Sequence, residues 1–104
     1  MQTEAQRIEQ RIVLSLRTCY DPEIPVNILE LGLIYAIDVD DHGCAAIKMT
    51  LTSPNCPAAQ ELPVEVKERA ERTMGVTAIN VEVVWQPPWH AGMMTEAAQL
   101  QLNL

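Results

Sequence analysis

The sequence has no phenylalanine, only four glycines and no long apolar run, and these shortages narrow the class of protein. No apolar stretch approaches the ~18–20 residues that a membrane-spanning helix needs, so we expect no membrane association. The first residues are polar and lack a basic stretch followed by an apolar core. That pattern is not a secretory signal, and it favours a cytoplasmic location.

Positive charge is also scarce. Seven Lys and Arg stand against 14 Asp and Glu, the net charge is −7, and the basic residues form no stripe. The phosphate backbone of a nucleic acid would be repelled on average, so we expect no nucleic-acid partner. The three cysteines are widely spaced without a C-x-x-C pair, so the sequence predicts neither a zinc knuckle nor a thioredoxin-type redox pair.

The composition that remains is that of one ordinary domain, which we place over residues 1–104. Hydrophobic residues make up 48% of the 104 and charged residues 20%, as in globular rather than disordered chains. Apolar residues at helical spacing predict a first helix over 4–18, a second from about 57 to 74 and a last one ending near 102. Thr3 with Gln6 forms a capping-box pattern.

The second helix carries an irregularity at Pro63. An apolar stripe of Leu62, Val66, Ala70 and Met74 indicates its buried face. A proline inside a helix removes a backbone hydrogen bond, so we expect a kink at Pro63; a helix that restarts there is the alternative.

Alternating apolar residues predict three strands, over 33–39, 44–52 and 79–85. Tyr35 is expected on one face of the first strand together with Ile37 and Val39, and Trp85 on the core face of the last strand. Residues 40–43 read as a hairpin turn, which makes the first two strands antiparallel, and a helical crossover joins the third. The fold class is therefore α+β, with a three-stranded mixed sheet packed by helices in the order α-β-β-α-β-α.

Cys56 is the cysteine most suited to chemistry. Pro57 follows it, and proline is favoured at the first helical position, so Cys56 is expected at a helix N-cap. The free amides and the helix dipole there favour a thiolate, which is a nucleophile and a soft-metal ligand. The structural alternative is a small apolar residue at a loop-to-helix junction. For Cys19 we expect a structural role, and for Cys44 an exposed and incidental one.

Asp21 and Glu23 lie in the proline-rich stretch Asp21-Pro22-Glu23-Ile24-Pro25. One interpretation is a turn that stops the first helix. The other is a pair of carboxylates on a stiff loop, available to a metal or to polarise a thiol. The topology allows this loop and the one carrying Cys56 to approach each other at one end of the sheet.

Residues 86–92 hold two adjacent prolines and cannot continue a sheet. Pro88 and Trp89 would offer a stiff aromatic surface to a partner if exposed. Trp89 folded over the core as a lid is the alternative.

Three stretches together resemble one family. They are Asp21–Pro25 with Leu31-Gly32-Leu33-Ile34-Tyr35, then Met49-Thr50-Leu51-Thr52 with Cys56-Pro57, and Trp85-Gln86-Pro87-Pro88-Trp89. In this order they resemble the SufT-like, PaaD-related family of iron–sulfur cluster assembly proteins. Longer relatives that serve phenylacetate oxygenation carry a cysteine-rich tail that is missing here, which favours the general assembly branch.

The resemblance implies a maturation factor that assists cluster transfer or insertion into apoproteins, and not an enzyme. Cys56 matches the signature cysteine of the family, Asp21 and Glu23 its acidic loop, and Thr52 its threonine. Cys56 would be a transient ligand of iron or of an iron–sulfur cluster, with none tightly bound. A cluster held across a homodimer, or with ligands from a client, would complete the set. The implied partners are iron–sulfur assembly proteins and client apoproteins.

Three rival hypotheses stay open. The protein could be a metal-free adaptor that recruits client apoproteins to the assembly machinery. It could be an enzyme with Cys56 as nucleophile, His90 as base and Asp21 as orienting group. A redox sensor is the weakest of the three, because no resolving cysteine lies near Cys56 in sequence.

Overall fold

The first helix begins where the capping pattern places it. The computed structural model describes residues 2–20, 26–52 and 61–102. Helix α1 (Glu4–Leu16) starts after Thr3, whose hydroxyl accepts the Gln6 amide while the Gln6 side chain accepts the Thr3 amide. The α1 stripe of Ile8, Ile12 and Leu16 is buried. The helix ends earlier than predicted, because Tyr20 already pairs in extended conformation with Asn27.

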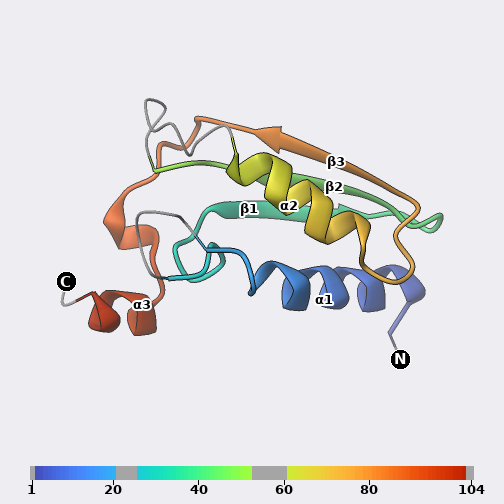
Figure 1. Cartoon of the computed structure of the whole chain (residues 1–104), viewed down its shortest axis with the longest axis horizontal. Helices are drawn as coiled ribbons and strands as arrows, with labels where there is room; N and C mark the ends of the chain where they lie inside the picture. The colour runs from blue at the N-terminus through green and yellow to red at the C-terminus, as the bar shows by residue number, and fades with distance from the viewer. Residues whose placement is uncertain (1, 21–25, 53–60, 103–104) are drawn as a thin grey trace.

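The sheet has the predicted mixed topology. Strand β1 (Ile34–Val39) pairs antiparallel with β2 (Cys44–Met49), and β2 pairs parallel with β3 (Ala78–Val83), in the order β1-β2-β3. Helices α1 and α2 (Leu62–Glu71) run along the same side of this sheet in Figure 1. A short 3₁₀ turn η2 (Ala91–Met93) and helix α3 (Glu96–Gln101) follow β3. The α+β fold and the element order are confirmed.

The core lies between the sheet and the helices. Along β2 the residues alternate between exposed and buried, and Ala45, Ile47 and Met49 face the helices. They pack with the α1 stripe and with Val66 of α2 in one buried cluster. Among the described residues, no helix is long and apolar enough to cross a membrane.

Two aromatic residues depart from the predicted alternation. The β1–β2 register shifts between Ile34 and Ala36, so Tyr35 does not keep the predicted alternation with Ile37. Its hydroxyl donates to the Pro87 carbonyl. The prediction for Trp85 was also wrong. Strand β3 ends at Val83, and the Trp85 side chain is 44% exposed.

Helix α2 corrects the expectation at Pro63. The described part of the helix begins at Leu62, so Pro63 stands in the first turn, where its missing N–H costs little. The predicted kink is therefore wrong. The alternative, a helix that restarts at Pro63 after a first loose turn, depends on residues 57–60, which lie outside the described residues. Met74, predicted in the buried stripe, is 76% exposed because α2 already ends at Glu71.

Candidate functional site

The predicted site residues divide between described and undescribed parts of the chain. Asp21, Glu23 and Cys56 lie outside the described residues, and so does the predicted N-cap at Cys56. Thr52 lies in a bend shortly after β2 and is half-buried. The geometry of the site therefore comes from the residues that lead into and out of these positions.

The chain on either side of residues 21–25 is tied together. Tyr20 and Asn27 form an antiparallel bridge, and the Ile28 amide donates to the Cys19 carbonyl at 3.0 Å. The Asn27 side chain then accepts the amides of Leu29 and Glu30, both at 3.0 Å, which starts a tight turn. These hydrogen bonds fix the positions of the residues directly before and after the acidic stretch.

Backbone hydrogen bonds continue from this turn to the end of β2. The Leu33 amide donates to the Ile28 carbonyl at 3.1 Å, and the Thr50 amide donates to the Leu33 carbonyl at 2.8 Å. Together with the bond from Ile28 to Cys19, they link the chain just before Asp21 to the chain that leads into Cys56. Backbone hydrogen bonds thus connect the residues that flank the acidic stretch with the residues that lead into the cysteine loop.

A second connection crosses the same end of the molecule. We call residues 84–95, from the end of β3 to the start of α3, the strap. It begins beside the end of β2, where the Val84 amide donates to the Met49 carbonyl at 2.8 Å. It finishes where the Thr95 amide donates to the Glu30 carbonyl at 2.8 Å. In Figure 1 the strap descends at the left, from the tip of β3 to α3.

Trp89 fastens the middle of the strap. Its indole Nε1–H donates to the Leu31 carbonyl at 2.7 Å, and its half-buried ring packs against the core. Pro88 is exposed. Trp89 therefore has an internal contact of the kind that the lid interpretation requires, and a role of its exposed part toward a partner stays a prediction.

Gly32 lets the strap and the turn approach closely. Its φ of +79° lies in the left-handed region, and a Cβ atom there would lie 2.5 Å from the Met93 carbonyl oxygen. Only glycine satisfies both conditions without strain. The Gly32 backbone thus sits directly against the end of the strap.

The two described cysteines are poor candidates for ligands at this end of the sheet. Cys19 is fully buried, and burial raises the pKa of its thiol to about 11, so it stays protonated at neutral pH. Cys44 is exposed, as predicted, and begins β2. At ~3.3 Å per strand residue it lies roughly 20 Å from Thr50.

In the turn between β1 and β2, the carboxylate of Asp40 binds backbone amides of the turn itself. Asp40 Oδ1 accepts the amides of Cys44 at 3.0 Å and of His42 at 2.8 Å. These hydrogen bonds lower the pKa of the Asp40 carboxyl, and the one from Cys44 has the larger effect. Over the described ranges, no group of three or more His, Cys, Asp or Glu side chains could hold a metal ion.

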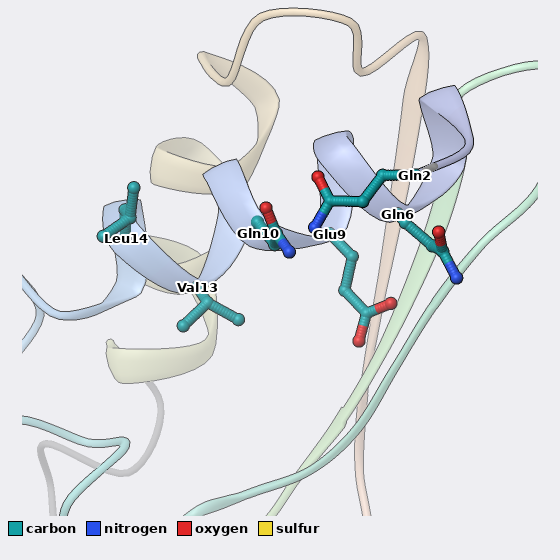
Figure 2. Close-up of a pocket in the computed structure, with 6 residues that line it drawn as sticks. All are labelled: Gln2, Gln6, Glu9, Gln10, Val13 and Leu14. Carbon is teal, nitrogen blue, oxygen red and sulfur yellow. The ribbon is translucent and has the colours of Figure 1, made fainter.

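A surface hollow of about 590 Å³ lies along α1. Figure 2 shows that the side chains lining it come from α1 and from the residues just before it; they are Gln2, Gln6, Glu9, Gln10, Val13 and Leu14. Among the residues that the structure describes, no cysteine or histidine lines this hollow. None of the described residues that line it belongs to the predicted site.

Sequence reasoning missed one residue of this region, Thr50. The alternating pattern predicts Thr50 on the polar face of the strand, but it is fully buried. Threonine is an ordinary strand residue, so its type alone gave no signal.

The comparisons with known proteins agree with this architecture. Residues 9–83 match the family model described as iron–sulfur cluster assembly protein. The chain belongs to this family. The predicted resemblance to the SufT-like proteins is thereby confirmed.

Individual relatives match almost end to end. An Fe-S protein maturation auxiliary factor of Porphyromonas gingivalis is 45% identical, with 99% of this chain and 98% of the relative aligned. The Fe-S protein maturation auxiliary factor SufT of Staphylococcus aureus is 37% identical, over 81% of this chain and 96% of the relative. A crystal structure of a domain of unknown function from Bacillus anthracis superposes with a TM-score of 0.89 at 35% identity, covering 96% and 95% of the two chains.

Proposed function

We propose that this family member assists the maturation of iron–sulfur proteins by helping to transfer or insert clusters into apoproteins, with Cys56 as a transient thiolate ligand. The observation that carries the proposal is the near end-to-end match to maturation auxiliary factors. The backbone hydrogen bonds that connect the chain before Asp21 with the chain that leads into Cys56 agree with it.

The distribution of cysteines favours a carrier over a storage site. Iron–sulfur clusters are commonly held by four thiolates. Cys19 is buried with a raised pKa, and Cys44 lies at the far end of β2. One chain therefore offers Cys56 as its available thiolate at this end. Incomplete ligation suits a cargo that must be released, and a second copy or the client supplies the remaining ligands.

The neighbouring polar residues have supporting roles in this proposal. Asp21 or Glu23 takes up the proton of the Cys56 thiol or supplies an oxygen ligand to iron. Thr52 orients the thiol by a hydrogen bond. None of them performs a catalytic step, because the cargo moves by exchange of ligands.

Partners are iron–sulfur assembly proteins that load the chain and apoproteins that receive the cargo. Pro88 and the exposed part of the Trp89 ring are the proposed contact surface on the strap. Prolines reduce the conformational freedom that binding would otherwise remove, and aromatic rings carry much of the energy of protein interfaces.

Anaerobic reconstitution with ferrous iron and sulfide, read by visible absorption, tests the role of Cys56. We expect a sulfur-to-iron charge-transfer band in the wild type that is lost in Cys56→Ser. Cys44→Ser is the matched control, because it makes the same exchange at an exposed site distant from the end of β2. It should keep the band.

Two other outcomes contradict the carrier proposal. An unchanged band in Cys56→Ser shows that another group holds the iron. A wild type without any band, but with full support of client maturation, favours the metal-free adaptor. In that case Cys56→Ser should also mature the client normally.

A further inference from the structure

Two surface hollows adjoin at Val13, on the outer face of α1. The first is the hollow of about 590 Å³ that α1 and the residues just before it line. The second has a volume of about 340 Å³ and is lined by Val13, Arg17, Asn27, Leu29, Glu30 and Thr95. Because Val13 lines both hollows, they form one continuous surface, the α1 groove.

The centre of the α1 groove is apolar. Val13 is half-buried, and Leu14 beside it is 62% exposed, whereas the core stripe of the same helix is buried. Toward the amino end of α1 the groove is lined by polar side chains, and Figure 2 shows Glu9 and Val13 pointing to the same side of the helix. An apolar centre within a polar rim is the common arrangement of protein interfaces.

The charges that α1 brings to the groove are placed symmetrically about Val13. Glu9 lines the first hollow four residues before Val13, and Arg17 lines the second four residues after it. At 1.5 Å of rise per residue the two are about 12 Å apart along the helix, too far to pair with each other. Arg17 shares its hollow with Glu30, yet none of the ion pairs in the described part of the chain includes Glu9, Arg17 or Glu30. Both charges of α1 are therefore available to a binding partner.

A second copy of the same chain complements this pattern. When two α1 helices lie antiparallel with their Val13 residues opposite each other, Glu9 of each copy faces Arg17 of the other. The exposed Leu14 side chains then meet beside the two-fold axis. A two-fold interface is self-complementary, so both ion pairs form at once. A partner surface of a single charge sign would instead place a like charge against either Glu9 or Arg17.

We propose that the α1 groove binds a second copy of this chain through antiparallel α1 helices. Helix α1 has 13 residues and is about 20 Å long, so the contact is smaller than a standard protein interface and the dimer should be weak. In this arrangement the two α1 ends that lead toward residue 21 point away from each other. The proposal therefore goes beyond the proposed function, and the dimer should form with or without iron.

Sedimentation equilibrium of the metal-free protein, at concentrations up to the high micromolar range, measures the dimer. The weight-average mass of the wild type should rise with concentration toward that of two chains. Leu14→Glu should weaken the dimer about tenfold, because it places two carboxylates beside the two-fold axis. Leu100→Glu is the matched control: Leu100 is 68% exposed, lies on α3 and lines neither hollow, so this variant should associate like the wild type.

Charge reversal tests the antiparallel pairing itself. Glu9→Lys and Arg17→Glu should each weaken the dimer about tenfold, because each change turns two attractions into two repulsions. An equimolar mixture of the two variants should associate like the wild type, since each cation of one chain then faces a carboxylate of the other. Both positions are exposed, so the thermal unfolding temperature of each variant should stay close to that of the wild type.

Each contrary result overturns the proposal. A wild type that sediments as single chains throughout the range shows that a second copy does not occupy the α1 groove. A dimer that survives Leu14→Glu, or that Leu100→Glu weakens equally, does not form through this groove. Single reversals that weaken the dimer without recovery in the mixture exclude the antiparallel pairing. All of these results leave the role of Cys56 standing, because the reconstitution with iron and sulfide tests it separately.

Discussion

Replacing Trp89 with phenylalanine removes the donor that fastens the strap to the turn before β1. The indole Nε1–H lies 2.7 Å from the Leu31 carbonyl, and Leu31 is fully buried. Phenylalanine keeps an aromatic ring but leaves that carbonyl without its partner. An unsatisfied buried acceptor costs about 1–3 kcal/mol, which is the expected loss in the free energy of unfolding.

Urea unfolding measures this loss directly. For a domain of this size each kcal/mol corresponds to roughly 4–8 °C in the midpoint of thermal unfolding. Hydrogen exchange adds a local readout, because loosening the strap should speed exchange of the Thr95 amide, which donates to the Glu30 carbonyl.

Trp85→Phe is the matched control for the Trp89 variant. Trp85 is 44% exposed and stands four residues earlier in the same strap. Its replacement should change the free energy of unfolding by less than about 0.5 kcal/mol, as is usual for surface positions. Equal effects of the two substitutions would refute the argument that the Trp89 hydrogen bond secures the strap.

Three further substitutions test other parts of the structure. Gly32→Ala should lower the free energy of unfolding by about 1–3 kcal/mol in a urea titration, because it forces a left-handed φ and a contact with the Met93 carbonyl; Gly92→Ala, which meets only a side chain, should cost less. Pro63→Ala should change it by under about 1 kcal/mol, whereas a proline in a helix interior would give a gain near 3 kcal/mol. The raised pKa of Cys19 predicts a contribution to stability that is complete below the unfolded thiol pKa and lost as pH rises toward about 11, so unfolding at pH 8 and pH 11 should differ less in Cys19→Ala than in the wild type.

Local chemistry made much of the fold predictable. The capping box at Thr3 and Gln6 fixes the start of α1, and alternation along β2 gives its buried face at Ile47. These signals depend on residues close in sequence, so no tertiary context was needed. The topology followed from the hairpin and from the helical crossover.

The failures have tertiary causes. Tyr35 was misplaced because a register shift in β1 interrupts the alternation, and a bulge leaves no clear mark in the sequence. Met74 continues the spacing of the α2 stripe but lies beyond the end of the helix.

Long-range contacts also limited the prediction of the site. The motif that includes Cys56 identified a family but gave no distances. The bond from Trp89 to Leu31 joins residues 58 positions apart, and the burial of Thr50 depends on what surrounds it. Such relations appear only in the folded chain.

Transfer of cargo to a client tests the central claim most directly. Protein reconstituted with ferrous iron and sulfide would be mixed anaerobically with an apoferredoxin, and the absorption of the ferredoxin cluster would be followed after separation. The account predicts that the wild type and Cys44→Ser load the ferredoxin faster than the same amounts of free iron and sulfide do. Cys56→Ser should give no advantage over the free ions. Equal transfer by Cys56→Ser and the wild type would contradict the account.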